Sequence, residues 1–150
     1  MKVSPATIES ASRPKMSEEE EPVILRTQDA RGVVTLTLNR PRAFNALSEM
    51  MLAEFQREFD AIASDESVRA VVIAAEGKAF CAGHDLKEMR ADPSMEYYER
   101  LFGKCSEMML AIQRLPVPVI ARVEGIATAA GCQLVAMCDL AVASSTARFA

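Results

Sequence analysis

Apolar and polar residues alternate along the chain with two different periods, which predict strands and helices respectively. In the stretch 33–38, Val34, Leu36 and Leu38 alternate with threonines, the period-two pattern of a half-buried strand. The uninterrupted apolar run at 70–75 is typical of a strand that is buried on both faces. Further strands are expected at 23–27, 119–123 and 139–143.

Helical periodicity appears in three places between these strands. Residues 48–63 are predicted to be a helix, capped by Ser48 or Asn45, with one apolar face formed by Leu47, Met51, Phe55, Phe59 and Ile62. A second helix is expected over 95–115, and a third over 131–138. The apolar face of the second helix is rich in methionine and comprises Met95, Tyr98, Leu101, Phe102, Cys105, Met108, Met109 and Ile112. This face fits core packing, and it also fits an acyl-chain wall, since methionine adapts to irregular shapes. The order of elements predicts an α/β fold with parallel crossovers.

The composition limits the classes of function. With 150 residues, half of them hydrophobic, the chain can form one domain with a real core. A net charge of −4 gives no reason to expect nucleic acid, and the sequence has no apolar run long enough for a bilayer. Four cysteines without CxxC spacing and a single histidine argue against a metal site and favour reduced thiols. We therefore expect a reducing compartment, the cytoplasm or alternatively the mitochondrial matrix.

Residues 1–22 differ from the remainder of the chain. They are rich in serine, proline and glutamate and end in four consecutive glutamates followed by Pro22. This composition predicts a disordered acidic tail, with the domain occupying residues 23–150.

The stretch 78–89, KAFCAGHDLKEM, holds the first candidate for chemistry. It follows the predicted strand at 70–75, contains a turn at Gly83, and continues into a polar helical start at Asp85. Such a strand–turn–helix junction directs unpaired backbone N–H groups at one spot, which suits an anion or an oxygen that becomes one. An ordinary loop explains this stretch equally well when it is taken alone.

A second stretch of the same kind, 124–139, reads EGIATAAGCQLVAMCD. It follows the strand at 119–123 and opens a helix through small residues, which let a ligand approach the backbone closely. Two such turns can converge on one carbonyl oxygen and form an oxyanion hole.

Three blocks of the sequence, in this order, resemble the crotonase superfamily, the enoyl-CoA hydratase/isomerase family. They are LNRPRAFNAL at 38–47, GKAFCAGHDLKEM at 77–89 and EGIATAAGCQLVAMCDLAVAS at 124–144. The resemblance implies a crotonase-like α/β fold, a ββα superhelix of the ClpP/crotonase type. Because that fold continues into further sheet and C-terminal helices, the sequence is expected to be truncated.

The resemblance also implies a chemistry, the stabilisation of an enolate-like acyl-CoA thioester by two backbone N–H groups. By motif these donors belong to His84 and Ala130, although alanine stands where the family more often has glycine. The side chain of His84 is alternatively a general acid or base. Gln133 occupies the position of the first catalytic glutamate of a hydratase, and an amide cannot take a proton from water at neutral pH. Hydratase activity is therefore doubtful.

The resemblance places the coenzyme A moiety of the substrate on two segments. Arg42, Ala43 and Phe44 would contact its phosphate and adenine, while the pantetheine side would be lined by Ala82, Asp85, Leu86 and Lys87. Coenzyme A enters as part of the thioester, so no separate cofactor is implied. Family members assemble as trimers or hexamers, which is the expectation for the full-length protein.

Two alternative functions remain open, and two others are excluded by the sequence. A catalytically silent acyl-CoA-binding protein and a non-functional fragment are alternatives to an enzyme. A dinucleotide-binding domain lacks the GxGxxG motif after a strand. A serine peptidase would need a histidine base, and the single histidine lies in the donor turn.

Overall fold

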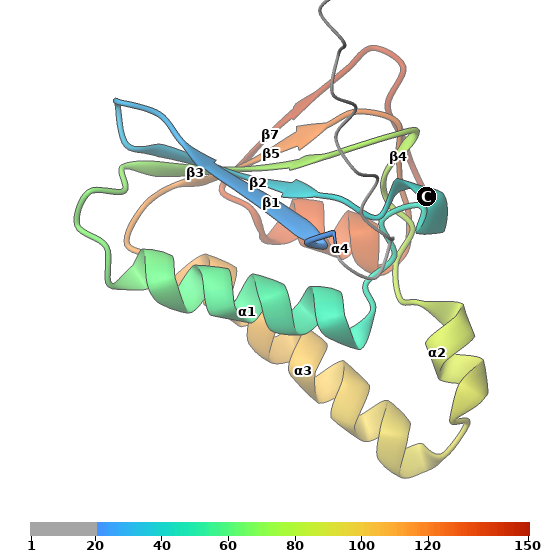
Figure 1. Cartoon of the computed structure of the whole chain (residues 1–150). Coiled ribbons are helices and arrows are strands. Elements are labelled where there is room, and N and C mark those ends of the chain that lie inside the picture. The colour runs from blue at the N-terminus through green and yellow to red at the C-terminus, as the bar shows by residue number, and fades with distance from the viewer. Residues whose placement is uncertain (1–20) are drawn as a thin grey trace, which may run out of the picture.

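The computed structural model describes residues 21–150, and the predicted tail lies outside the described residues except for Glu21 and Pro22. A five-stranded sheet in the order β1-β2-β3-β5-β7 forms the centre of the molecule (Figure 1). Its strands are β1 (Ile24–Gln28), β2 (Val33–Leu38), β3 (Ala70–Ala75), β5 (Val119–Val123) and β7 (Leu140–Ala143). β1 pairs with β2 in antiparallel fashion, and all the other pairs are parallel.

A second, smaller sheet was not predicted from the sequence. It consists of three short parallel strands in the order β4-β6-β8: β4 (Ala79–Cys81), β6 (Ile126–Ala127) and β8 (Arg148–Phe149). The first two strands have three and two residues, too few for any period to be visible in the sequence. Their pairing holds together the two turns on which the site is built.

The helices close the parallel crossovers between the strands. They are the short 3₁₀ helix η1 (Pro41–Ala43), α1 (Glu49–Ala63), α2 (Leu86–Ala91), α3 (Met95–Arg114) and α4 (Ala130–Met137). α1 and α3 lie side by side over one face of the large sheet, and α2 projects beside the N-terminal end of α3 (Figure 1). None of the helices within residues 21–150 is long and apolar enough to cross a membrane.

The hydrophobic core forms where the predicted patterns place it. All five residues of the predicted α1 face are buried, and Ser48 caps that helix by accepting a hydrogen bond from the Met51 N–H. In β2, the side chains of Val34, Leu36 and Leu38 are fully buried while the threonines between them keep some exposure. Much of the interior is therefore explained by the two periodicities alone.

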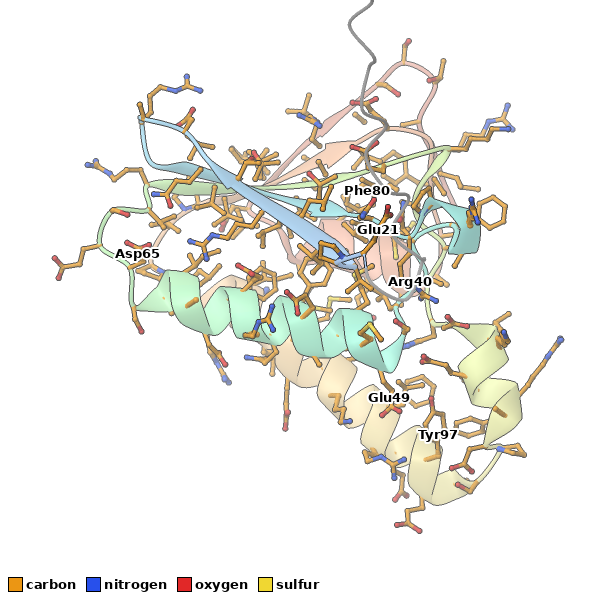
Figure 2. The ribbon with its side chains drawn as sticks, viewed as in Figure 1. Glu21, Arg40, Glu49, Asp65, Phe80 and Tyr97 are labelled. Carbon is orange, nitrogen blue, oxygen red and sulfur yellow. The ribbon has the colours of Figure 1, made fainter. Side chains whose placement is uncertain are left out.

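Two expectations about burial were wrong in part. In β3, Val71 and Ile73 are fully buried, but Val72 on the opposite face is only partly covered, because α1 and α3 pack on one face of the sheet (Figure 1). On the predicted apolar face of α3, Met95 and Phe102 are exposed, whereas Tyr97, near the N-terminal end of the helix, is buried although it was not assigned to that face (Figure 2). This end of α3 extends past the end of α1, so helical periodicity alone could not say which side is covered (Figure 1).

Candidate active site

The first predicted donor turn joins the small sheet to α2. β4 ends at Cys81, the backbone passes through Gly83 at a φ of 88°, and Asp85 then caps α2 by accepting a hydrogen bond from the Lys87 N–H. A positive φ of this size is accessible to glycine at no steric cost. The predicted sequence of strand, glycine turn and helix start is confirmed.

Two hydrogen bonds to Leu47 fix the direction of the His84 peptide group. The Leu47 N–H donates to the Gly83 C=O (2.8 Å), and the Asp85 N–H donates to the Leu47 C=O (3.2 Å). In a trans peptide unit the C=O and N–H point in opposite directions. Since the Gly83 carbonyl points at Leu47, the N–H of His84 points away from it. This N–H has no hydrogen-bond partner among residues 21–150.

The second donor turn leads from β6 into α4. Ala130 is the first residue of α4, and the carbonyl of Ala129 before it accepts a hydrogen bond from the Gln133 N–H (3.1 Å). By the same geometry the N–H of Ala130 points out of the helix, and no acceptor for it lies in the described part of the chain. Ala129 has φ 50° and ψ −123°, a conformation that favours glycine, so the turn carries backbone strain.

The two turns lie against each other. A Cβ placed on Gly83 would come within 3.3 Å of the Ala130 nitrogen and 3.1 Å of the Ala129 Cβ. The Thr128 N–H donates to the Cys81 carbonyl (3.0 Å), and β4 pairs with β6 directly before both turns. The N–H groups of His84 and Ala130 therefore belong to adjoining turns of one small sheet, and neither has a partner among the described residues.

The side chain of His84 faces α3. Its ring packs edge-to-face on the ring of Phe102, with 5.0 Å between the centroids, and its Nδ1 is buried without a hydrogen-bond partner among the described residues. Burial lowers the pKa of this imidazole below its ordinary 6.5, so the ring is neutral at pH 7. A neutral ring beside a benzene ring is consistent with packing, and the unpartnered Nδ1 accepts or donates according to the tautomer of the ring.

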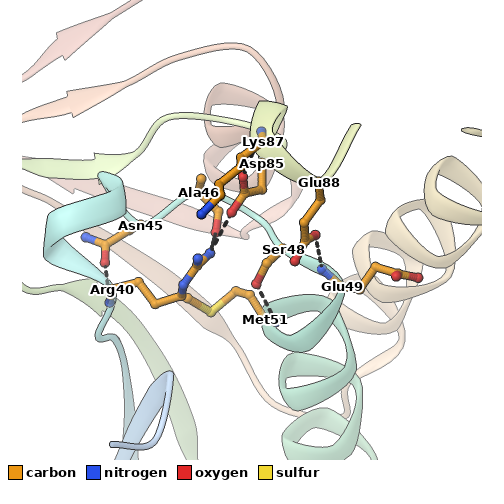
Figure 3. A network of polar contacts seen from close by, with 9 residues as sticks. All are labelled: Arg40, Asn45, Ala46, Ser48, Glu49, Met51, Asp85, Lys87 and Glu88. Atoms are coloured by element: carbon orange, nitrogen blue, oxygen red, sulfur yellow. Dashed lines mark hydrogen bonds and ion pairs between the residues drawn. The ribbon is translucent and has the colours of Figure 1, made fainter. Parts of the chain in front are cut away.

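A polar network joins the start of α1 to the first donor turn (Figure 3). Arg40 donates through Nη1 to the Ala46 carbonyl and to Asp85 Oδ2, both at 3.1 Å. Glu88, in α2, accepts a hydrogen bond from the Glu49 N–H at the first turn of α1 (2.8 Å). The carboxylate of Glu49 in turn pairs with Lys104 of α3 (3.0 Å).

Asn45 has a different role from the helix cap for which it was a candidate. It is fully buried at a φ of 53°, and its amide donates to the carbonyls of Glu76 and Ala79, both at 2.8 Å. Its Oδ1 accepts the Arg40 N–H (2.8 Å). Asparagine tolerates this backbone conformation better than most residues, and this was the available signal for a turn.

The segment predicted to contact coenzyme A adjoins the first donor turn. Arg42 and Phe44 are exposed at η1, and the Phe44 carbonyl accepts a hydrogen bond from the Ala82 N–H (3.1 Å). Ala43 is partly buried in the same turn.

On the other side of the turn, Leu86 and Lys87 are exposed, as a ligand contact requires. The Asp85 carboxylate, in contrast, is already bound to Arg40 and to the Lys87 N–H. The side chain of Asp85, which was expected to line the pantetheine side, is therefore engaged within the protein.

Gln133 lies exposed on the first turn of α4, four residues after Ala129. Its side chain is neutral and can orient a water molecule through its amide, but it cannot act as a base. The four cysteines are free thiols, and burial raises the pKa of Cys81 to about 11 and that of Cys138 to about 12. Within residues 21–150 no group of histidine, cysteine and acidic side chains is arranged to hold a metal ion.

Comparison with known proteins decides the family. The sequence profile of the enoyl-CoA hydratase/isomerase family matches residues 28–150. The chain belongs to the enoyl-CoA hydratase/isomerase family. Among curated proteins it is similar to enoyl-CoA hydratase domain-containing protein 3, mitochondrial, of Xenopus laevis, with 47% identity over 123 residues, 82% of this chain and 42% of that protein.

Solved structures of the family show the same fold. A crystal structure of enoyl-CoA hydratase from Mycobacterium smegmatis has a TM-score of 0.86 and 75% identity, covering 87% of this chain and 51% of that one. The crystal structure of human enoyl-CoA hydratase domain-containing protein 3 has a TM-score of 0.81 and 42% identity, covering 85% and 50%. The mixed α/β crotonase fold predicted from the three sequence blocks is confirmed, and the chain spans about half the length of these family members.

Proposed function

We propose that the chain binds an acyl-CoA thioester and polarises its carbonyl with the N–H groups of His84 and Ala130. The observation that carries the proposal is that these two groups lie on adjoining turns, point outward and lack partners in the described structure. A carbonyl oxygen that accepts both bonds gains negative charge as the acyl group becomes enolate-like. Each donor is typically worth about 3–4 kcal/mol in such a transition state.

Coenzyme A is proposed to lie along η1 and the start of α2. The exposed guanidinium of Arg42 supplies a cation for a phosphate, and the exposed ring of Phe44 borders the same turn. Because Phe44 is hydrogen-bonded to Ala82, a ligand held at η1 lies next to the first donor turn. The backbone around Ala82 and the exposed side of Leu86 and Lys87 would line the path toward it.

The acid–base equipment of the site is weak. Gln133 is the side chain on the first turn of α4 that the family resemblance assigns to water activation, and it cannot accept a proton. The carboxylates of Asp85 and Glu88, which follow the first donor, are both engaged in hydrogen bonds. Slow hydration or none is the expected outcome, and these features also favour a second candidate, an acyl-CoA-binding protein without turnover.

Binding of crotonyl-CoA to the 150-residue chain, measured by calorimetry, tests the proposal. Replacing Arg42→Glu should weaken binding about tenfold, since it exchanges a charge-assisted hydrogen bond for repulsion. Arg69→Glu is the matched control, because Arg69 is exposed at the other end of β3. His84→Ala should bind as well as the original chain, because its N–H remains.

The loss of the enoyl absorbance over time measures hydration in the same samples. The original chain should hydrate crotonyl-CoA slowly, and Gln133→Glu should bring at most a modest gain. Absence of crotonyl-CoA binding, or equal binding by Arg42→Glu, would contradict the proposed site. Rapid hydration by the original chain would contradict the role given to Gln133, and loss of activity in His84→Ala would establish the imidazole as an acid or base.

A further inference from the structure

The guanidinium of Arg40 joins two segments that are 45 residues apart in the sequence. One nitrogen, Nη1, donates both to the Ala46 carbonyl and to Asp85 Oδ2, at 3.1 Å each (Figure 3). The backbone N–H of Arg40 is itself fixed by buried Asn45. The backbone of Arg40 is therefore fixed next to η1, and its guanidinium reaches Asp85 in the first donor turn.

Asp85 divides its carboxylate between two tasks. Oδ1 accepts the Lys87 N–H (3.0 Å) and caps α2, while Oδ2 accepts the hydrogen bond from Arg40. The side chain of Asp85 is 12% exposed and that of Arg40 27%, so solvent screens this ion pair less than a surface pair.

This ion pair acts on the residue next to the predicted donor. α2 has no fully buried residue, and among its hydrophobic side chains only the partly buried Met89 packs on the core, so packing contributes little to holding Asp85 in place. The direction of the His84 N–H depends on the bonds to Leu47 and on the position of Asp85, which follows it in the chain. A hydrogen bond weakens steeply as its angle departs from linear, so a small rotation of this peptide would weaken the donor.

The charge of Asp85 adds a second effect. A carboxylate one residue away from a donor N–H would repel the negative charge that develops on a bound carbonyl oxygen. The guanidinium of Arg40 offsets that negative charge, because it pairs directly with the Asp85 carboxylate. Without Arg40, the turn would be less firmly held and would also present an uncompensated negative charge beside the oxyanion.

We infer that Arg40 and Asp85 are positioning residues for the proposed reaction: their ion pair aims the His84 N–H and cancels the carboxylate charge beside it. This inference rests on the proposed function. It does not require either side chain to touch the substrate.

The test uses cinnamoyl-CoA, whose conjugated thioester absorbs at longer wavelength when hydrogen bonds polarise its carbonyl. The size of this red shift on binding to the 150-residue chain reports the strength of the donors, and the dissociation constant is measured in the same titration. Asp85→Asn removes the charge but keeps an N-cap, since asparagine caps helices as well as aspartate does. Arg40→Gln removes the cation and leaves the carboxylate. Asp29→Asn is the matched control, because Asp29 also forms a close ion pair, with Arg31 (2.7 Å), in the exposed β1–β2 turn.

The expected order of red shifts separates positioning from a merely structural role. Arg40→Gln should lose more than half of the shift, and Asp85→Asn should lose less. The double variant should recover part of what Arg40→Gln lost, because the unpaired charge is gone. Arg40→Lys should keep part of the shift, Asp29→Asn should keep all of it, and the circular dichroism of every variant should match that of the original chain.

Several outcomes would overturn the inference. A full red shift in Arg40→Gln would show that the ion pair does not position the donor. If Arg40→Gln and the double variant lose the same share of the red shift, the charge of Asp85 does not weaken the donor, and the electrostatic part of the inference is wrong. If the original chain binds cinnamoyl-CoA without any red shift, the oxyanion hole of the proposed function fails, and the inference fails with it.

Discussion

At the scale of single residues, the main chain and the side chain of His84 have different surroundings. Its main-chain N–H is directed away from Leu47, whereas its imidazole packs on Phe102, with no partner for Nδ1 in the described part of the chain. The depressed pKa of the ring is caused by burial alone. The neutral form of His84 is therefore favoured in the folded protein.

A titration of the single histidine checks this. The imidazole signals of His84 in a proton NMR spectrum should titrate with a midpoint below 6.5. In the unfolded chain the same ring takes up its proton near pH 6.5, so the unfolded state binds more protons as the pH falls below that value. As the pH falls from about 6.5 to the pKa of His84 in the folded protein, the free energy of unfolding should therefore decrease. Below that pKa, His84 should cause no further decrease.

His84→Gln should abolish this part of the pH dependence while leaving the loss at lower pH. Asp29 and Asp65 contribute to that loss, because their pKa values are lowered in the folded protein. The main causes are the hydrogen bonds that they accept from Val33 and from Ser67 respectively. A midpoint at or above 6.5 would mean that the imidazole is solvated or has found an acidic partner.

Which residues of the site could be predicted follows from how they act. The two strand–turn–helix junctions were predicted from glycines, small residues and a helix start, and the resemblance to the family selected the N–H groups of His84 and Ala130 within them, which the structure leaves without a partner in the described residues. The network of Arg40, Asn45 and Glu88 could not be predicted, because its bonds join segments more than 30 residues apart. Only the folded chain brings those partners together.

At the scale of elements, α2 differs from its neighbours. α1 buries five side chains and α3 six, but α2 buries none; it is held by the partly buried Met89, which packs on the core, and by polar contacts. Among these is the hydrogen bond from the Tyr98 hydroxyl to the Met89 carbonyl (3.0 Å). The long amphipathic helices were predictable from their periodicity, whereas the short strands β4 and β6 are defined by their pairing in the small sheet, which also includes β8.

Hydrogen exchange should show that α2 opens independently of α1 and α3. Tyr98→Phe removes one hydrogen bond and should speed amide exchange in α2 roughly three- to tenfold, corresponding to about 0.5–1.5 kcal/mol. Tyr97→Phe is a matched control from the adjacent position, because the buried hydroxyl of Tyr97 has no partner within the described chain. Uniform protection across α1, α2 and α3 would contradict an independent opening.

At the scale of the whole molecule, the large sheet ends in an exposed edge. All four residues of β7 are exposed, including Leu140 and Val142 at 62% and 64%. β7 is the last strand in the sheet order, and in the part of the chain that the structure describes no strand pairs with its outer side. An apolar, unpaired edge strand readily pairs with another chain.

The 150-residue chain should therefore self-associate, with sedimentation velocity showing species larger than a monomer at micromolar concentration. Val142→Lys should reduce this association, because a charged side chain on an edge strand opposes further pairing. Leu110→Lys, which makes the same change at an exposed position of α3, should have a smaller effect. A monodisperse monomer with a cooperative thermal transition would contradict the prediction.

The close approach of Gly83 to the second turn has a consequence for how such a gene can vary. The two proposed donors are main-chain atoms, so a codon change at position 84 or 130 leaves the donor in place unless it introduces proline. A codon change at Gly83 adds a side chain within 3.3 Å of the Ala130 nitrogen and at an unfavourable φ. In a library of all single variants selected for thioester binding, position 84 should accept many amino acids, while position 83 should accept glycine alone.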